Sequence, residues 1–150
     1  HRQFCKAIAN MLPRLHSLGL GFFSRSMQDE SLGIFGHLLG KGSDSLKTLE
    51  LGICSQTLTV QGAKIFADRL KKGRFPNLEK LTIRFKETFI FDGLYDIVQA
   101  ITVAFPNVKK LDFFFPVTHT KETRGVQQKA TALLKEKLKN LPSNFELQWK

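Results

Sequence analysis

The stretch LKTLELGIC, Leu46–Cys54, carries the pattern that decides the fold. Leucines occupy its first, fourth and sixth positions, and a cysteine occupies the ninth. Alternation of this kind is typical of a β-strand with one buried face. Positions 4 and 6 are therefore expected to point into a core, and positions 3, 5 and 7 to point away from it.

The same pattern returns along the whole chain, about every 31 residues. It is found in LHSLGL at 15–20, LEKLTI at 78–83 and VKKLDF at 108–113. A fifth copy, NFELQW at 144–149, is expected to place Leu147 and Trp149 at positions 4 and 6. An apolar residue followed by proline precedes four of the strands: Leu12-Pro13, Phe75-Pro76, Phe105-Pro106 and Leu141-Pro142.

Between these strands the apolar period changes from two residues to that of a helix. After Cys54 the helical stripe is expected to begin at an N-cap, Thr59, and to stop near Gly73. Asp92 is the expected N-cap of the next helix. Further helices are expected at Ser31–Gly40 and at about Thr123–Leu141. The first residues also predict a helix, whose buried stripe would be Phe4, Ala7, Ile8 and Met11.

A strand and a helix of this length cannot bury their own apolar faces, but stacked copies can. We therefore expect one domain over residues 1–150, built from about five strand–helix units with a parallel sheet. The first residue is His1, and the pattern opens inside a helix, so we expect an excerpt of a longer chain.

The stretch LKTLELGICSQTLTVQGAKIFADRL, residues 46–70, resembles the leucine-rich repeat family, of the long-unit type found in ribonuclease inhibitor. In that family a Cys or Asn at position 9 turns the chain out of the strand, and an L-T-x-x-G-A stretch opens the helix. The matching residues here are Cys54, Leu58, Thr59, Gly62 and Ala63. The resemblance implies an α/β solenoid with parallel strands on a concave face, helices on a convex face, and a buried Cys54 thiol.

The strand positions that the core leaves free predict where a partner binds. An array of this shape usually presents a binding surface on its strands, so we expect a protein-interaction scaffold that contacts another protein or a larger complex there and at the adjoining loops. The predicted partner-binding residues are Thr48, Glu50, Lys80, Thr82, Arg84, Lys110, Asp112 and Phe114. Phe114 is also expected to form an exposed apolar patch with Phe89 and Phe91. Position 8, by contrast, predicts a core column: Phe22, Ile53, Phe85 and Phe115.

The formal net charge of +10 supports an alternative, the binding of nucleic acid or another polyanion through basic patches. The basic residues are densest at Arg69–Arg74 and in residues 108–150. They do not alternate with aromatic residues as they do in grooves for single-stranded nucleic acid.

No pattern of catalytic residues is recognisable, so we predict a non-enzyme without cofactor or metal. The histidines (His1, His16, His37 and His119) have no recurring carboxylate neighbour. GHLLGKGSDS, Gly36–Ser45, departs from the phosphate-binding loop, because its glycines are expected to end a helix rather than open one. Cys5 has no partner at metal-binding spacing.

No apolar run approaches the roughly 20 residues that a membrane helix needs. No signal peptide is recognisable, and two cysteines make no disulfide framework. These features predict an intracellular, cytoplasmic protein.

Overall fold

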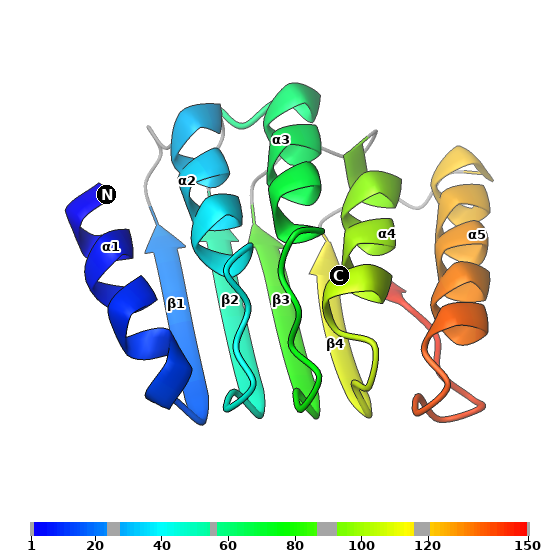
Figure 1. Cartoon of the computed structure of the whole chain (residues 1–150). Helices are drawn as coiled ribbons and strands as arrows, with labels where there is room; N and C mark the ends of the chain where they lie inside the picture. The colour runs from blue at the N-terminus through cyan, green and yellow to red at the C-terminus, as the bar shows by residue number, and fades with distance from the viewer. Residues whose placement is uncertain (1, 24–27, 55–56, 87–92, 116–120, 150) are drawn as a thin grey trace.

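The computed structural model describes residues 2–23, 28–54, 57–86, 93–115 and 121–149, and strands and helices alternate along them (Figure 1). The strands are β1 (Ser17–Phe23), β2 (Thr48–Cys54), β3 (Lys80–Lys86), β4 (Lys110–Phe115) and β5 (Gln148–Trp149). The helices are α1 (Arg2–Met11), α2 (Asp29–Leu39), α3 (Val60–Leu70), α4 (Leu94–Ala104) and α5 (Lys121–Lys137), with a short 3-10 turn η1 (Leu12–Arg14) after α1.

The strands form one parallel sheet in the order β1-β2-β3-β4-β5, so every strand pairs with its neighbour in sequence. All five helices cover the same side of this sheet, and the other side carries no helix of the described part of the chain (Figure 1). The expected α/β class with a parallel sheet is therefore confirmed.

The register of the first four strands follows the sequence pattern. Leu18, Leu49, Leu81 and Leu111 are aligned across the sheet, and each is buried. The position-6 residues behave in the same way: Leu20, Leu51, Ile83 and Phe113. Since side chains alternate between the faces of a strand, the intervening residues lie on the side away from the helices. We call that side the strand face.

The core is one cluster that runs between the sheet and the helices. The column expected at position 8 is confirmed for Ile53, Phe85 and Phe115, which are all buried; the Phe22 side chain lies outside the described part. The Phe85 ring lies 5.8 Å from that of Phe115 and 6.2 Å from that of Phe113, measured between centroids. Such tilted contacts are favoured by aromatic rings, so the phenylalanines join neighbouring units.

The connections that lead from helix to strand are joined by a ladder of asparagines. The Asn77 amide donates to the backbone oxygen of Asp44 at 2.7 Å, and the Asn107 amide donates to that of Pro76 at 2.8 Å. Phe75 and Phe105, which precede the prolines of these connections, are buried with ring centroids 5.0 Å apart. Each unit thus holds the one before it by backbone-directed hydrogen bonds as well as by packing.

The α2–α3 contact explains the glycines of α2 and part of the L-T-x-x-G-A stretch. A Cβ atom at Gly36 would lie 2.9 Å from the backbone oxygen of Phe66, so the missing side chain allows close approach. At the start of α3, Thr59 is the N-cap as expected, and its hydroxyl accepts from the Gly62 amide at 3.4 Å. The Asp29 carboxylate accepts from the Thr59 backbone N–H at 2.8 Å and from the Thr59 hydroxyl.

Within Gly36–Ser45, Gly40 and Gly42 end α2, as expected, whereas Gly36 lies inside the helix. Gly40 is the C-cap, and its N–H donates to the Gly36 carbonyl. Gly42 follows with a φ of +70°, a conformation that favours glycine. The N–H of Ser43 then donates to the Arg74 carbonyl, which joins this turn to the next unit.

Two expectations for the ends of the chain are wrong. The buried side of α1 is formed by Cys5, with Ile8 and Ala9 partly buried, while Phe4 and Met11 are both 48 % exposed. A stripe one residue further round this helix packs better, because it continues into the buried Leu12 of η1.

The fifth strand is also displaced from its expected register. Gln148 pairs with Phe114, and Trp149 pairs with Phe115, which moves Leu147 level with Phe113 rather than Leu111. A shift of two residues keeps each side chain on the same face, so apolar alternation cannot distinguish the two registers.

Three details of the predicted elements also change. The last helix is Lys121–Lys137 rather than about Thr123–Leu141, and Gly93 stands at the N-cap of α4. The proposed cap Asp92 lies outside the described residues. Cys54 is half-buried rather than buried.

Candidate functional site

The strand face presents three rows of side chains that cross the sheet. The registers align Ser17, Thr48, Lys80 and Lys110 in the first row, Gly19, Glu50, Thr82 and Asp112 in the second, and Gly21, Gly52, Arg84 and Phe114 in the third. Small residues are gathered on β1 and β2, whereas long and charged side chains are gathered on β3 and β4. The side chains of the strand face are therefore short over β1 and β2, which we call the low side, and long over β3 and β4, which we call the high side.

A hollow of about 260 Å³ lies where the low side meets the high side. Its lining combines the backbone of three glycines with the long side chains that rise beside them: Gly19, Leu20, Gly21, Glu50, Gly52, Ile53, Arg84 and Lys86. A Cβ atom built on Gly19 would meet nothing within 4 Å. Glycine therefore keeps the hollow open here, although the fold itself has room for a larger residue.

Arg84 stands at the centre of this arrangement. Its guanidinium lies 5.0 Å from the ring centroid of Phe114, and its Nη1 lies 3.9 Å from Oε1 of Glu50. The side chains of Arg84 and Glu50 are 49 % and 58 % exposed, so this ion pair is well solvated and contributes little to stability. The guanidinium thus remains accessible for a planar, bidentate contact with a carboxylate or phosphate.

The other cations of the strand face extend from Arg84 toward the start of the strands. Lys80 and Lys110 are adjacent in the register and exposed. Lys109 and Glu79 stand just before β4 and β3, outside these rows, and lie 3.9 Å apart, again in a solvated pair. The face is therefore mixed in charge, with its exposed cations concentrated on β3 and β4.

The predicted partner-binding residues are all placed on this face, but they are not equally accessible. Thr82 is only 5 % exposed, which corrects the expectation that it offers contact surface. It lies between Lys80 and Arg84 along its strand and between Glu50 and Asp112 across the sheet, and these longer side chains surround the short threonine. Phe114 is half-buried beside Arg84 rather than freely exposed, while Phe89 and Phe91 lie outside the described residues.

The hollow itself includes residues that the sequence did not single out for binding. Gly19, Gly21 and Gly52 present no side chain on this face, and Lys86 is the last residue of β3. The available signal was the run of outward glycines on two adjacent strands, since strand glycines often mark sites where another backbone approaches.

The described residues offer little for chemistry. No group of three or more histidine, cysteine or carboxylate side chains capable of holding a metal occurs among them. Cys5 is buried, and burial raises the pKa of its thiol, which disfavours the reactive thiolate at neutral pH. His16 and His37 are exposed, and His119 lies outside the described segments.

In comparisons with known proteins, no family model matches the chain and no curated protein matches it. None of the described helices is both long enough and apolar enough to cross a membrane.

Proposed function

We propose that the chain is a leucine-rich-repeat interaction module that binds another protein on its strand face. The support for the repeat assignment is the spacing of L-x-x-L-x-L together with the in-register stacking of β1 to β4. Each unit contacts its neighbours in sequence, which is the arrangement that stacked repeat proteins use. A non-enzymatic role accords with the absence of a recognisable catalytic pattern in the sequence.

The observation that carries this proposal is the glycine-lined hollow beside Arg84. A glycine floor exposes the backbone of β1 and β2, against which a partner's main chain or a flat side chain can pack closely. Arg84 and Lys86 line the hollow, so an acidic side chain from the partner is the expected contact there. Lys80 and Lys110 extend the same complementarity along the face.

The proposed contact is tested by filling the hollow. Gly19→Trp is expected to weaken the affinity for the protein partner captured from cell extract by about tenfold or more. The indole would occupy the space that the partner fills at the desolvated centre of the interface. The fold is expected to be retained, since nothing lies within 4 Å of the added Cβ atom. Binding is measured by calorimetry or surface plasmon resonance with the purified partner.

The matched control is Gly125→Trp on α5, a second glycine at which an added Cβ meets nothing within 4 Å. This variant is expected to bind like the wild type. If Gly19→Trp bound equally well, the hollow would not be the contact site.

Salt dependence separates this proposal from the polyanion alternative. Binding to nucleic acid is expected to fall by orders of magnitude between about 50 and 200 mM salt. A protein partner held by packing in the hollow is expected to persist over that range, because salt screens exposed charges more than buried contacts. Retention of RNA and loss of every protein at the higher salt would contradict the proposal.

A further inference from the structure

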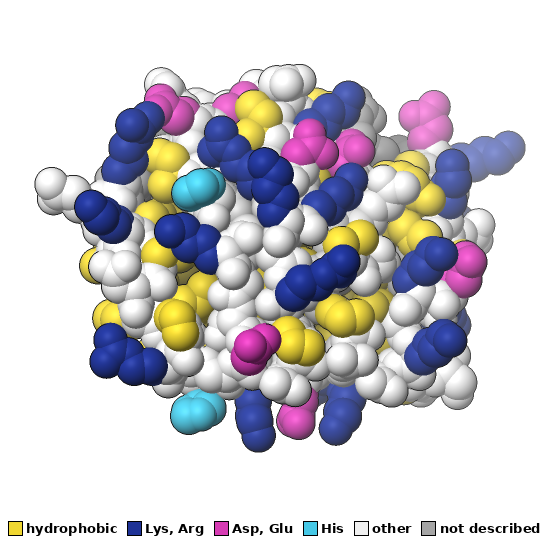
Figure 2. Space-filling view, in the orientation of Figure 1, with side chains coloured by type: hydrophobic (Ala, Val, Ile, Leu, Met, Phe, Trp, Pro, Cys, Tyr) yellow, Lys and Arg dark blue, Asp and Glu magenta, His cyan; other side chains and the backbone are white. Residues whose placement is uncertain are grey.

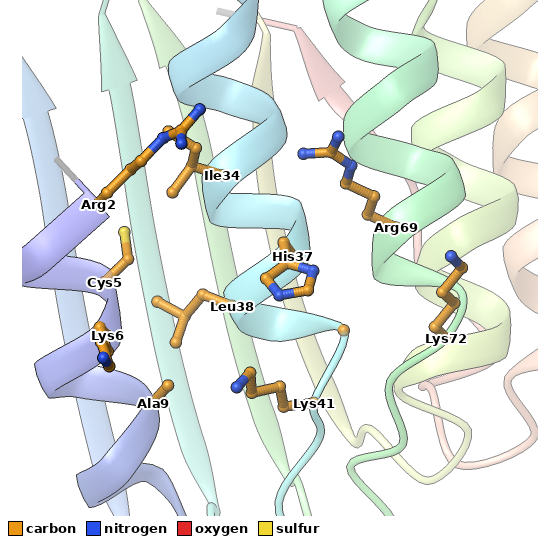
Figure 3. A pocket seen from close by; sticks show the side chains of 11 residues that line it. Arg2, Cys5, Lys6, Ala9, Ile34, His37, Leu38, Lys41, Arg69 and Lys72 are labelled. Carbon is orange, nitrogen blue, oxygen red and sulfur yellow. The ribbon is translucent and has the colours of Figure 1, made fainter.

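A second hollow, on the opposite side of the molecule, has a basic border around an apolar base. It has a volume of about 770 Å³ and lies over α1, α2 and α3. Its charged lining consists of Arg2, Lys6, Lys41, Arg69 and Lys72, and none of the described residues that line it is acidic. Figure 2 shows Lys and Arg side chains gathered over these helices, and Figure 3 shows that all three helices contribute to the hollow.

Five lysine and arginine side chains from three successive units border the hollow. Arg2 and Lys6 are four residues apart on α1, Lys41 follows the end of α2, and Arg69 and Lys72 stand at and just after the end of α3. Like charges four residues apart on a helix repel one another, as Arg2 and Lys6 do. Five cations facing one hollow leave a positive potential that an anion would neutralise.

Protein carboxylates do little to neutralise this hollow. The Arg2 guanidinium pairs with Oε1 of Glu30 at 2.8 Å, and both side chains are more than two-thirds exposed. No ion pair joins Lys6, Lys41, Arg69 or Lys72 to a carboxylate within the part of the chain that the structure describes. These four charges are therefore available to a ligand.

Helix dipoles account for only part of the arrangement. Lys41 and Lys72 follow the carboxyl ends of α2 and α3, where the partial negative charge of the helix favours cations. Arg2 and Lys6 lie more than one turn before the carboxyl end of α1, beyond the reach of that attraction. The dipoles therefore do not explain why α1 turns two cations toward the same space.

The base of the hollow is apolar. Cys5 and Leu38 are buried there, and Ala9 and Ile34 are partly buried. In Figure 3, the Leu38 side chain points from α2 toward α1, and the Arg69 guanidinium points from α3 toward α2. The cations thus stand around an apolar base, an arrangement suited to a ligand with both anionic and less polar parts.

We propose that this hollow binds a compact anion that carries several phosphate groups. Its volume falls within the range of small-molecule sites, roughly 300–1,000 Å³. A nucleic-acid strand is less suited, because the described lining holds no Phe, Tyr or Trp on which bases could stack. The site is separate from the strand face, so it does not depend on the proposed partner binding.

The test is calorimetric titration of the 150-residue chain with inorganic tripolyphosphate and with ATP. Both are expected to bind, with inorganic phosphate at least about tenfold weaker, because one phosphate engages fewer cations. Tripolyphosphate is also expected to raise the melting temperature, since a ligand that binds only the folded state stabilises it. If ATP bound and tripolyphosphate did not, recognition would lie in the nucleoside rather than in the phosphates, and the proposal would be overturned.

The lining variant carries Lys6→Gln, Lys41→Gln and Lys72→Gln. It is expected to lose affinity for tripolyphosphate by about tenfold or more, because three of the charges facing the ligand are removed. Gly19→Trp on the strand face is expected to leave this affinity unchanged, which keeps the two sites experimentally distinct.

The matched control removes three exposed charges elsewhere on the helices, with Lys64→Gln, Arg124→Gln and Lys135→Gln. Its affinity for tripolyphosphate is expected to stay within about twofold of the wild type, since only long-range screening changes. Equal losses in the two variants would show that only net charge matters and would overturn the site. So would the absence of tripolyphosphate binding, or binding of single-stranded RNA that tripolyphosphate does not displace.

Discussion

Replacing Leu81 by alanine is expected to lower the free energy of unfolding by about 2–5 kcal/mol. Leu81 is fully buried near the start of β3, and its register partners on the two flanking strands are Leu49 and Leu111. Because the interior is closely packed, removal of this side chain leaves a cavity that the surrounding units fill only in part. The same loss is expected for Leu49→Ala, which is buried to the same extent.

Urea denaturation followed by circular dichroism measures this effect. The control is Lys80→Ala, one residue earlier on the same strand, whose side chain is exposed and whose change is expected to stay within about 0.5 kcal/mol. A loss below about 1 kcal/mol for both leucine variants would mean that the stacked leucines do not form a shared core.

Reversing the charge of three exposed cations on the strand face is expected to weaken the affinity for a protein partner by about a hundredfold. Lys80→Glu, Arg84→Glu and Lys110→Glu together convert favourable contacts with an acidic partner into repulsive ones. The chain is expected to remain folded, because the Arg84–Glu50 pair is solvated and contributes little. The measurement compares dissociation constants for the purified partner, with circular dichroism as the check on folding.

A matched variant separates location from net charge. Lys64→Glu, Arg124→Glu and Lys135→Glu change the charge by the same amount on the helices, away from the strand face. This control is expected to retain most of the affinity. Equal weakening by both triple variants would place the effect in long-range electrostatics rather than in contact at the strand face.

Much of the fold follows from sequence because its determinants are local and repeated. The leucines of 46–51 and their copies predict both the buried face and the register of β1 to β4, since each strand must align its apolar side chains with those of its neighbours. The helix that follows Cys54 could also be predicted, because its N-cap Thr59 and its apolar stripe lie within a few residues of one another.

The errors occur where two solutions satisfy the same local pattern. On α1, the stripes that begin at Phe4 and at Cys5 are both apolar, and only packing against η1 and the neighbouring unit selects the second. At β5, two registers differ by an even number of residues and preserve the same buried face. Sequence periodicity carries no information that distinguishes such alternatives.

The two hollows depend on side chains that are distant in sequence. Thr82 is buried because longer side chains on three strands surround it. The hollow over α1, α2 and α3, here called the helix-side hollow, joins residues from three helices. The basic run Arg69–Arg74 was visible in the sequence, but its side chains make different contacts in the structure. Arg69 and Lys72 line the helix-side hollow, whereas Arg74 donates to the Val103 carbonyl at 2.6 Å.

Site-specific photo-crosslinking is the most direct measurement of where the partner protein lies. Benzoylphenylalanine is introduced in place of Thr48, which is on the strand face but does not line the hollow, or in place of Lys64 on α3. Each protein is irradiated with the partner at 200 mM salt, about the upper end of the salt series above. A covalent adduct from the Thr48 position, and none from the Lys64 position, is the expected result. An adduct from the Lys64 position alone would contradict binding at the strand face.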